Sequence, residues 1–215
     1  DGTTLYKLYQ NAFTPWEWQP ELKHIAEEEG LICFSSPFDK TSVDFLEAMD
    51  VPAYKIASFE ITDIPLIEYV ASKMKPVIIS TGIATYEDIE GAIAACKRVG
   101  NDQIALLKCT SSYPAPVALA NLRTIPDMRE RFKLPVGLSD HTMSSSVAIA
   151  SVALGARILE KHFILDRGIG GPDAAFSMNK EEFSEMVRCV REVEMALGKP
   201  TYELTEKVRN NRKFA

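Results

Sequence analysis

The sequence has little of what several common classes of protein need. No apolar run approaches the roughly 20 residues of a membrane-spanning helix, and the amino terminus lacks the charged and then apolar segments of a signal peptide. Lys and Arg are fewer than Asp and Glu, with a formal net charge of −6, and they are scattered along the chain. These features argue against a membrane protein and a nucleic-acid-binding surface. We therefore expect a cytoplasmic protein that holds any anionic substrate in a local cationic pocket.

Two further absences argue against a zinc site and against one class of fold. The four cysteines, Cys33, Cys96, Cys109 and Cys189, lack the close spacing of a zinc site, so we expect buried free thiols. A nucleophilic role for Cys109 is the less favoured interpretation, because no partner base is evident in the sequence. No G-x-G-x-x-G turn follows any predicted strand, which disfavours an open, doubly wound sheet.

The chain does contain six short apolar runs that each end in polar, reactive side chains. Its 215 residues, of which 46% are hydrophobic, are enough for one substantial core. The segments between the runs have the periodicity of amphipathic helices, which is typical of repeating βα units. Such units gather their functional groups at the carboxyl ends of parallel strands. The predicted strands span 32–38, 53–60, 77–82, 104–111, 136–141 and 157–163.

Proline and glycine mark the ends of the intervening helices. A closed barrel needs eight strands and typically about 250 residues, so the sequence predicts an α/β fold of the (β/α) TIM-barrel type, incomplete, with about six βα units. Residues 1–200 are expected to form this partial catalytic barrel, and the charged segment 201–215 to be a linker toward an absent domain. A helix without its own strand precedes the first predicted strand, so an amino-terminal piece is also expected to be absent. Helices are predicted at 19–30, 41–50, 64–75, 86–99, 126–132, 144–154 and 180–197, after a loop and short helix in the first 18 residues.

Two histidines close neighbouring predicted strands. His141 ends the fifth and His162 the sixth, and the alternation of strand side chains puts Ser139 on the face of His141 and Glu160 on the face of His162. Sequential strands usually pair, so we expect both imidazoles at one barrel mouth, within reach of a shared metal ion. This pair alone does not fix the metal's identity. An open position on a divalent cation can polarise a carbonyl oxygen, which suits an aldehyde substrate.

Hydroxyl groups and an ammonium group recur at the other strand ends. A single serine there is more often a helix cap, but the set, combined with helix amino ends, favours a phosphate pocket. Lys108 and Lys161 also lie in strand ends, and either would form a Schiff base if desolvated, although a structural role is more common. Glu60 and Asp173 add carboxylates in strand-end or loop contexts. The candidate anion-binding residues are Ser36, Lys55, Ser58, Ser80, Ser111 and Ser139.

These residues lie in motifs that resemble the sialic acid synthase family, and within it the branch that makes pseudaminic acid. The similarity runs over essentially the whole chain, and such a set of motifs in fixed order is highly specific. The stretches TPWEWQPELK and SFEITDIP resemble the pseudaminic branch rather than the N-acetylneuraminate branch. The motifs are SSPFDK (35–40), AYKIASFEITDIPLIEYVASK (53–73), STGIAT (80–85), KCTSSYPAP (108–116), GLSDHT (137–142), EKHF (160–163) and GGPDAAFS (170–177).

The resemblance implies a metal-dependent condensation of phosphoenolpyruvate with an N-acylated amino-sugar aldehyde, 2,4-diacetamido-2,4,6-trideoxy-altrose, to give pseudaminic acid and phosphate. Carbon 3 of phosphoenolpyruvate attacks the aldehyde, water adds at carbon 2, and the C–O bond to phosphate breaks. The resemblance also implies a divalent cation (Mn²⁺, Mg²⁺ or Co²⁺) and a homodimer. The alternative sugar is N-acetylmannosamine, which would make the chain an N-acetylneuraminate synthase.

The family's functional residues transfer by motif. Catalytic roles would fall on His141, His162, Lys55 and Glu60, and the two histidines would be the metal ligands. Contacts to phosphoenolpyruvate would be Ser36, Lys55, Ser58, Ser80, Ser111 and Ser139, although some relatives use threonine at Ser36 and asparagine at Ser111. Contacts to the sugar would be Glu60, Tyr113 and Asp173.

Two parts of the family pattern have no counterpart in this sequence. Members of the family begin with two more βα units, which supply an acidic residue and further substrate contacts. They end with a small antifreeze-like domain that places an arginine in the partner subunit's site. We therefore expect a truncated synthase with a metal and phosphate half-site and with poor or absent turnover. Two alternatives stay open: a Schiff-base aldolase using Lys108 or Lys161, and an inactive fragment that binds phosphoenolpyruvate.

Overall fold

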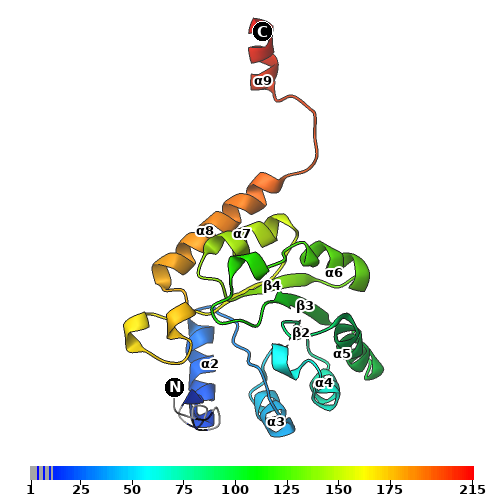
Figure 1. The fold of residues 1–215 in the computed structure, drawn as a ribbon, viewed down its shortest axis with the longest axis vertical. Coiled ribbons are helices and arrows are strands. Elements are labelled where there is room, and N and C mark those ends of the chain that lie inside the picture. Colours follow the sequence, from blue (N-terminus) through cyan, green and yellow to red (C-terminus); the bar gives the residue numbers. More distant parts are fainter. Residues whose placement is uncertain (1–3, 5–6, 8–9, 11) are drawn as a thin grey trace.

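The computed structural model of the chain contains a sheet of five parallel strands, flanked by helices (Figure 1). It describes residues 4, 7, 10 and 12–215. Of the loop and short helix predicted for residues 1–18, it shows a 3₁₀ helix at Trp16–Trp18. The strands are β1 (Tyr54–Ile56), β2 (Val77–Ser80), β3 (Ile104–Cys109), β4 (Val136–Asp140) and β5 (Leu159–Lys161). The helices are α2 (Gln19–Glu28), α3 (Lys40–Ala48), α4 (Ile64–Ala71), α5 (Tyr86–Arg98), α6 (Thr124–Phe132), α7 (Ser145–Ala153), α8 (Lys180–Leu197) and α9 (Glu206–Asn211).

The strands follow one another in sequence order across the sheet, from β1 to β5. Neighbouring strands are about 4.8 Å apart, so β1 and β5 are separated by four such spacings along the sheet. Nevertheless, Nζ of Lys55 in β1 lies 3.4 Å from Oε2 of Glu160 in β5. Side chains from the two edges can meet only because the sheet curls, and this confirms the predicted α/β fold as a half-barrel of the TIM type.

The sheet has five strands rather than the predicted six, because the segment 32–38 does not form one. It is extended and makes an isolated bridge, Ser35 with Tyr54, where Lys55 donates its backbone N–H to the Ser35 carbonyl at 3.2 Å. Pro37 has no N–H to add to a ladder, and Ile32 is 76% exposed, so the apolar pattern here is not buried. The segment therefore borders β1 without extending the sheet.

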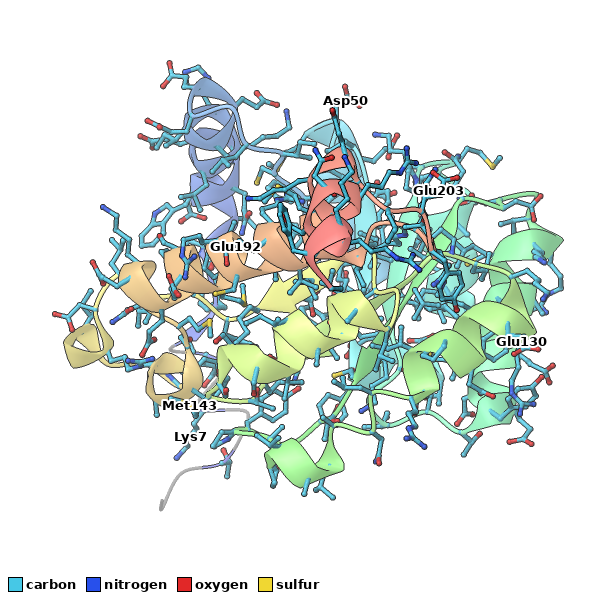
Figure 2. All side chains as sticks on the ribbon, turned by 90° about the horizontal axis from the view of Figure 1, so that it is seen from above. Lys7, Asp50, Glu130, Met143, Glu192 and Glu203 are labelled. Carbon is cyan, nitrogen blue, oxygen red and sulfur yellow. The ribbon has the colours of Figure 1, made fainter. Side chains whose placement is uncertain are left out.

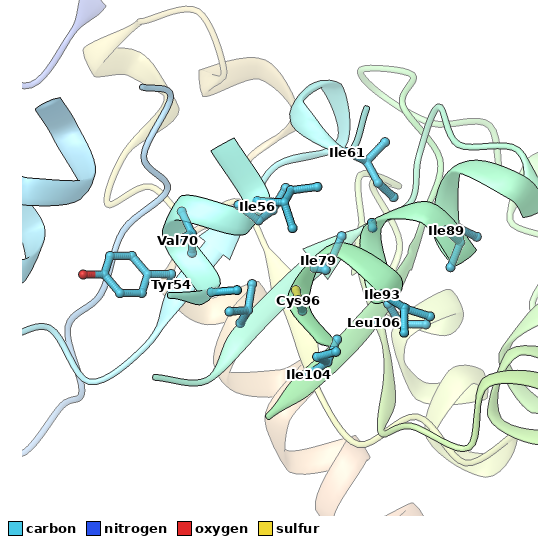
Figure 3. Packing of buried hydrophobic residues seen from close by; sticks show 14 of the residues in the cluster. Tyr54, Ile56, Ile61, Val70, Ile79, Ile89, Ile93, Cys96, Ile104 and Leu106 are labelled. Carbon is cyan, nitrogen blue, oxygen red and sulfur yellow. The ribbon is translucent and has the colours of Figure 1, made fainter. Parts of the chain in front are cut away.

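Alternate strand residues point toward the helices and form the main core. Tyr54, Ile56, Ile79 and Leu106 are fully buried on this helix-facing side. Figure 3 shows them beside side chains of α4 and α5 such as Val70, Ile89, Ile93 and Cys96. Full burial of such a side chain contributes about 1.5–3 kcal/mol. The core therefore lies between sheet and helices and leaves the concave face of the sheet to other side chains.

Side-chain caps fix where several helices begin. Asp39, Thr85 and Asn179 each accept a hydrogen bond from the backbone N–H three residues later and form a reciprocal capping box, at the starts of α3, α5 and α8. Each cap contributes about 1 kcal/mol. The α8 cap matches the predicted helix start at residue 180. The α5 cap holds the turn that follows β2, and the α3 cap holds the turn that follows the extended segment 32–38.

The carboxyl-terminal part packs differently from the main core. Helix α8 lies along α7, and Met186 and Val190 of α8 are buried with Ala148 and Val152 of α7. Beyond α8 the chain runs out in an extended segment to α9, which stands away from the sheet and its helices (Figure 1). In α9, buried side chains are absent among the residues that the structure describes.

Charged side chains are distributed over the outside of the molecule. Figure 2 marks Asp50, Glu130, Glu192 and Glu203, which lie after α3, in α6, in α8 and in the tail respectively. Within the described ranges, no helix is both long enough and apolar enough to cross a bilayer.

Candidate active site

The concave face of the sheet carries the predicted site residues of the strands. The ladder pairs Ser80 with Leu107, Cys109 with Ser139, and Ser139 with Glu160, so these residues share one face. Lys55 pairs with Ile78, two residues before Ser80, and belongs to the same face. Because strand side chains alternate, this face is opposite to the hydrophobic core.

Lys55 is the centre of a hydrogen-bonded network on this face. Its side chain is 9% exposed, and its Nζ donates to Ser80 Oγ at 2.8 Å and lies 3.4 Å from Glu160 Oε2. The other oxygen of Glu160 accepts a hydrogen bond from Ser139 Oγ at 2.6 Å. The network thus links β1, β2, β4 and β5 across the concave face. A buried ammonium group with hydroxyl neighbours is the composition of an anion site.

A second polar cluster surrounds Gly82, just after β2. The Gly82 N–H donates to Ser58 Oγ at 3.1 Å. A Cβ at this position would lie 2.1 Å from Ser111 Oγ, 2.8 Å from Ser58 Oγ and 2.9 Å from Cys109 Sγ. In the described part of the chain, the buried Ser111 hydroxyl has no hydrogen-bond partner. Buried hydroxyls are normally satisfied, so this one is available to a ligand.

The two strand-end histidines lie together. Their ring centroids are 5.2 Å apart, and His141 is 6% exposed. His141 Nδ1 is 3.1 Å from the Thr110 carbonyl oxygen, which can only accept, so Nδ1 carries the proton and Nε2 keeps its lone pair. Burial would lower the pKa of His141, but contact with Cys109 and with that carbonyl outweighs it, and the pKa is raised.

His162 is held by aromatic and acidic neighbours. Its ring centroid is 5.0 Å from that of Phe176, and its Nδ1 lies 3.4 Å from Asp173 Oδ2. Burial lowers the pKa of His162, His141 lowers it further, and Asp173 only partly opposes them. A lowered pKa favours the neutral imidazole, which is the form that binds metals.

The histidine pair fits part of a metal site. Among the residues that the structure describes, no group of three or more His, Cys, Asp or Glu side chains is placed to hold a metal ion. The bond from His141 Nδ1 to a backbone carbonyl is nevertheless the outer contact that metal-binding imidazoles usually make. His141 and His162 would therefore supply two ligands and leave other positions to water or substrate.

The predicted sugar-binding residues lie at the same mouth or close to it. The Tyr113 ring centroid is 4.4 Å from that of His141, and Asp173 contacts His162. Glu60 lies in a 3₁₀ turn, Ser58–Glu60, directly after β1. Burial raises the pKa of Glu60, and in the described ranges its buried Oε2 has no hydrogen-bond partner.

Ser36 is the predicted residue that the structure connects least to the others. It is half-buried, one residue beyond the bridge of Ser35 with Tyr54. The described residues show no side-chain hydrogen bond between Ser36 and the Lys55 network. Its place beside β1 still puts it near the strand that carries Lys55.

The two lysines of the Schiff-base alternative do not face the concave side. Lys108 pairs with Leu138 in the ladder, and Lys161 pairs with Asp140, both on the helix-facing side. Lys108 donates to Thr110 Oγ1 at 2.6 Å, and Lys161 is ion-paired to Asp140 at 2.7 Å. Burial lowers the pKa of Lys108, but the ammonium lies away from the polar face. This placement disfavours the Schiff-base mechanism.

The sequence analysis did not include three residues in the predicted site: Glu160, Cys109 and Gly82. Glu160 was placed on the face of His162 but not in the site, although it accepts from Ser139 and approaches Lys55. Cys109 lies beside a histidine, since its Sγ is 3.8 Å from His141 Nδ1. Burial would raise the pKa of Cys109, but the hydrogen bonds with His141 and Ser58 outweigh it, and the pKa is lowered. Strand alternation could have revealed Glu160 and Cys109, whereas the closeness at Gly82 leaves no signal in one sequence.

Comparison with known proteins places the whole chain in one group. The family model described as "NeuB family" matches residues 1–202. Pseudaminic acid synthase of Campylobacter jejuni serotype O:2 is 46% identical over 215 residues, which is 100% of this chain and 63% of that protein. Pseudaminic acid synthase of Helicobacter pylori is 44% identical over 214 residues, with the same two coverages. The chain therefore spans 63% of the length of these relatives.

A solved structure agrees with the sequence matches. The crystal structure of N-acetylneuraminic acid (sialic acid) synthetase from Leptospira borgpetersenii, in complex with citrate, superposes with a TM-score of 0.89 and 30% sequence identity. The superposition covers 97% of this chain and 73% of that one. The half-barrel is thus similar to a large part of a sugar-acid synthase.

Proposed function

We propose, from the premise that this chain belongs to the NeuB family, that it carries the phosphoenolpyruvate and metal half-site of a pseudaminic acid synthase. The substrates would be phosphoenolpyruvate and 2,4-diacetamido-2,4,6-trideoxy-altrose. Two relatives named pseudaminic acid synthase match the full chain at 44% and 46% identity, whereas the sialic acid synthetase structure is 30% identical. This difference supports the pseudaminic branch over N-acetylneuraminate synthesis.

The anion pocket would hold phosphoenolpyruvate. The ammonium of Lys55 would attract the phosphate or carboxylate, because charge-assisted hydrogen bonds are about twice as strong as neutral ones. Ser80 already contacts Lys55, and the hydroxyls of Ser58 and Ser111 meet at Gly82. Ser36 and Ser139 would complete the set from the two sides. The unpartnered Ser111 hydroxyl would then gain the hydrogen bond that it lacks within the described residues.

The histidine pair would hold the divalent cation, with Mn²⁺, Mg²⁺ and Co²⁺ as the candidates. When bound, such a cation polarises a carbonyl oxygen, which makes an aldehyde carbon a better electrophile. Thr110 keeps the proton of His141 on Nδ1 and so directs the Nε2 lone pair away from that carbonyl. Tyr113 and Asp173, which contact the histidines, would orient the sugar beside them.

Glu60 would act as a contact to the sugar. Burial raises the pKa of its carboxyl, although nearby Lys55 opposes this. Its Oε2, which has no hydrogen-bond partner among the described residues, would be free to pair with the sugar. This suits the turn after β1, where an amide or hydroxyl of the sugar would approach. In the overall reaction, carbon 3 of phosphoenolpyruvate bonds to the aldehyde carbon, water adds at carbon 2, and phosphate leaves.

The domain boundaries and the partners are part of this proposal. Residues 1–200 would form the catalytic half-barrel and 201–215 a linker, in line with the end of the family match at residue 202. The extended segment before α9 is consistent with a linker (Figure 1). A homodimer and a cytoplasmic location stay predictions. Analytical ultracentrifugation of the chain tests the first, because a monomer at micromolar concentration would contradict it.

The observation that carries the proposal is the 5.2 Å pairing of His141 with His162 on the sheet face that also carries Lys55. The test measures phosphate release from phosphoenolpyruvate with Mn²⁺, in parallel reactions with the trideoxy-altrose sugar and with N-acetylmannosamine. Reactions without sugar and with a chelator are the controls. Release with the first sugar alone is the expected result. Release with the second alone would move the assignment to N-acetylneuraminate synthesis.

Calorimetry with phosphoenolpyruvate accompanies this assay. Binding without phosphate release from either sugar would select the alternative of an inactive phosphoenolpyruvate-binding fragment. Absence of both binding and release would contradict the proposed half-site.

A further inference from the structure

The residues that directly precede the two histidines form a buried ion pair. Asp140 comes before His141, and Lys161 comes before His162. Their side chains, 3% and 2% exposed, meet on the helix-facing side of the sheet, with Oδ2 and Nζ 2.7 Å apart. They therefore lie behind the histidines, on the opposite face of the same two strands.

This ion pair is the last direct cross-link between β4 and β5. The ladder ends with the pair Asp140 and Lys161, so both histidines lie one residue beyond it. The His141 carbonyl accepts a hydrogen bond from Ala115, and the His162 carbonyl accepts one from Met178, at 2.9 Å each. These bonds connect each histidine to a different loop, and they do not connect the two histidines to each other. The distance between the two rings is thus not set by the ladder itself.

Further hydrogen bonds extend the cross-link around His141. The second oxygen of Asp140, Oδ1, accepts from the Thr142 N–H at 2.9 Å. Lys161 Nζ also donates to the Thr142 carbonyl oxygen. His141 is therefore bracketed by two residues, Asp140 and Thr142, that are both held by Lys161. Lys161 is covalently bonded to His162, so one ammonium group joins the backbones of both histidines.

A role in stability alone does not account for such a pair. Removing two charges from water is costly, and well-packed apolar residues often replace a buried ion pair without loss of stability. What the pair adds is a fixed geometry, because its directional bonds allow fewer arrangements than apolar contacts do. A buried polar pair of this kind is best understood by what it positions.

We propose that Asp140 and Lys161 are positioning residues that hold the imidazoles of His141 and His162 at the spacing a shared divalent cation requires. Neither side chain would touch the cation or the substrate. They act through the backbone, as an outer layer that orients two ligands at once. The inference deepens the proposed function, on which it rests for the identity of the ligand.

The test replaces both charges together, because a single substitution would leave an unpaired charge in the interior. The double variant Asp140→Asn with Lys161→Met is compared with wild type in two measurements on the full 215-residue chain. The first is Mn²⁺ affinity, measured by electron paramagnetic resonance. The second is the nuclear Overhauser effect between imidazole protons of His141 and His162, recorded without metal. We expect the Mn²⁺ dissociation constant to rise about tenfold, as for other outer contacts of metal ligands, and the Overhauser effect to weaken.

A matched control removes another ion pair that joins two elements. Asp44 of α3 and Lys73, just after α4, are 2.9 Å apart, with side chains 58% and 19% exposed. The variant Asp44→Asn with Lys73→Met should leave both measurements unchanged. A second variant, Asp140→Glu, keeps both charges and lengthens the bridge by one methylene, so it serves if the double variant does not fold. It should also weaken Mn²⁺ binding.

Wild-type Mn²⁺ affinity together with an unchanged Overhauser effect, in either folded Asp140 variant, would overturn the proposal. A merely structural role would lower the melting temperature and leave both measurements unmoved. The Overhauser comparison needs neither metal nor substrate. It therefore tests the positioning role even if the wild-type chain releases no phosphate. That second result would count only against the proposed function.

Discussion

Replacing Gly82 with alanine should damage the anion pocket. The new Cβ would lie 2.1 Å from Ser111 Oγ, 2.8 Å from Ser58 Oγ and 2.9 Å from Cys109 Sγ. Three neighbours on two different segments, the turn after β1 and the end of β3, cannot all move without cost, and overpacking of this kind typically costs about 1–3 kcal/mol. The hydrogen bond from Gly82 N–H to Ser58 would be strained as well, with a net worth of about 0.5–1.5 kcal/mol.

Ligand binding should weaken as well as folding. Ser58 and Ser111 would have to turn away from the place where we expect the anion. A hydrogen bond to a charged group is worth about 1.5–3 kcal/mol, so loss of one should weaken phosphoenolpyruvate binding by roughly ten- to a hundred-fold. Calorimetry gives the dissociation constant, and urea unfolding of the same samples gives the change in stability.

Gly91 provides the matched control, because a Cβ there would meet only Ile64 Cδ1, at 3.8 Å. Gly91 lies inside α5, where alanine is favoured over glycine by about 0.8–1.0 kcal/mol. Gly91→Ala should therefore stabilise the chain and leave phosphoenolpyruvate binding unchanged. The reasoning is refuted if Gly82→Ala binds phosphoenolpyruvate with wild-type affinity, or if the two variants shift stability equally.

Three further outcomes follow from the site and the core. Lys55→Met should weaken phosphoenolpyruvate binding at least tenfold in calorimetry, because its ammonium supplies the charge-assisted bond, and unchanged affinity would remove Lys55 from the pocket. His162→Ala should abolish Mn²⁺ binding whereas the exposed His24→Ala should not, and equal Mn²⁺ affinities in paramagnetic resonance would contradict the ligand assignment. Burial raises the pKa of Cys96 to about 11, so at pH 8 only about one thiol in a thousand would be a thiolate. Iodoacetamide should therefore label half-buried Cys33 in the native chain well before Cys96, and mass spectrometry showing equal rates would argue against this burial.

The regular part of the fold was predictable because its signals are local. Helix α8 begins at Lys180 and ends at Leu197, as its amphipathic periodicity and the following Gly198 predicted. The segment 32–38 has an equally apolar pattern, but the prediction of a strand there was wrong. A strand exists only with partners, and pairing across a sheet depends on residues far away in sequence. One bridge, at Ser35, is all that forms.

The candidate site was predictable to the extent that it follows from strand alternation. His141 and His162 were expected at one mouth, and their rings lie 5.2 Å apart, although their metal role stays a prediction. The contact of Lys55 with Glu160 was not predicted, because it depends on how strongly the sheet curls. The crowding at Gly82 was missed for a related reason. It arises where three loops converge, and no spacing along the chain encodes it.

The alternation along β1 has a consequence for how this protein can evolve. Tyr54 and Ile56 are fully buried against the helices, and Lys55 between them belongs to the polar network. A substitution at Tyr54 or Ile56 would therefore change the packing of the core, whereas one at Lys55 would change the polar network. Residues of the concave face can be exchanged to alter ligand binding while the helix-facing residues keep the fold intact. Asp140 and Lys161 are an exception, because they are buried on the helix-facing side and directly precede the two histidines. A substitution at either would therefore also affect the histidines.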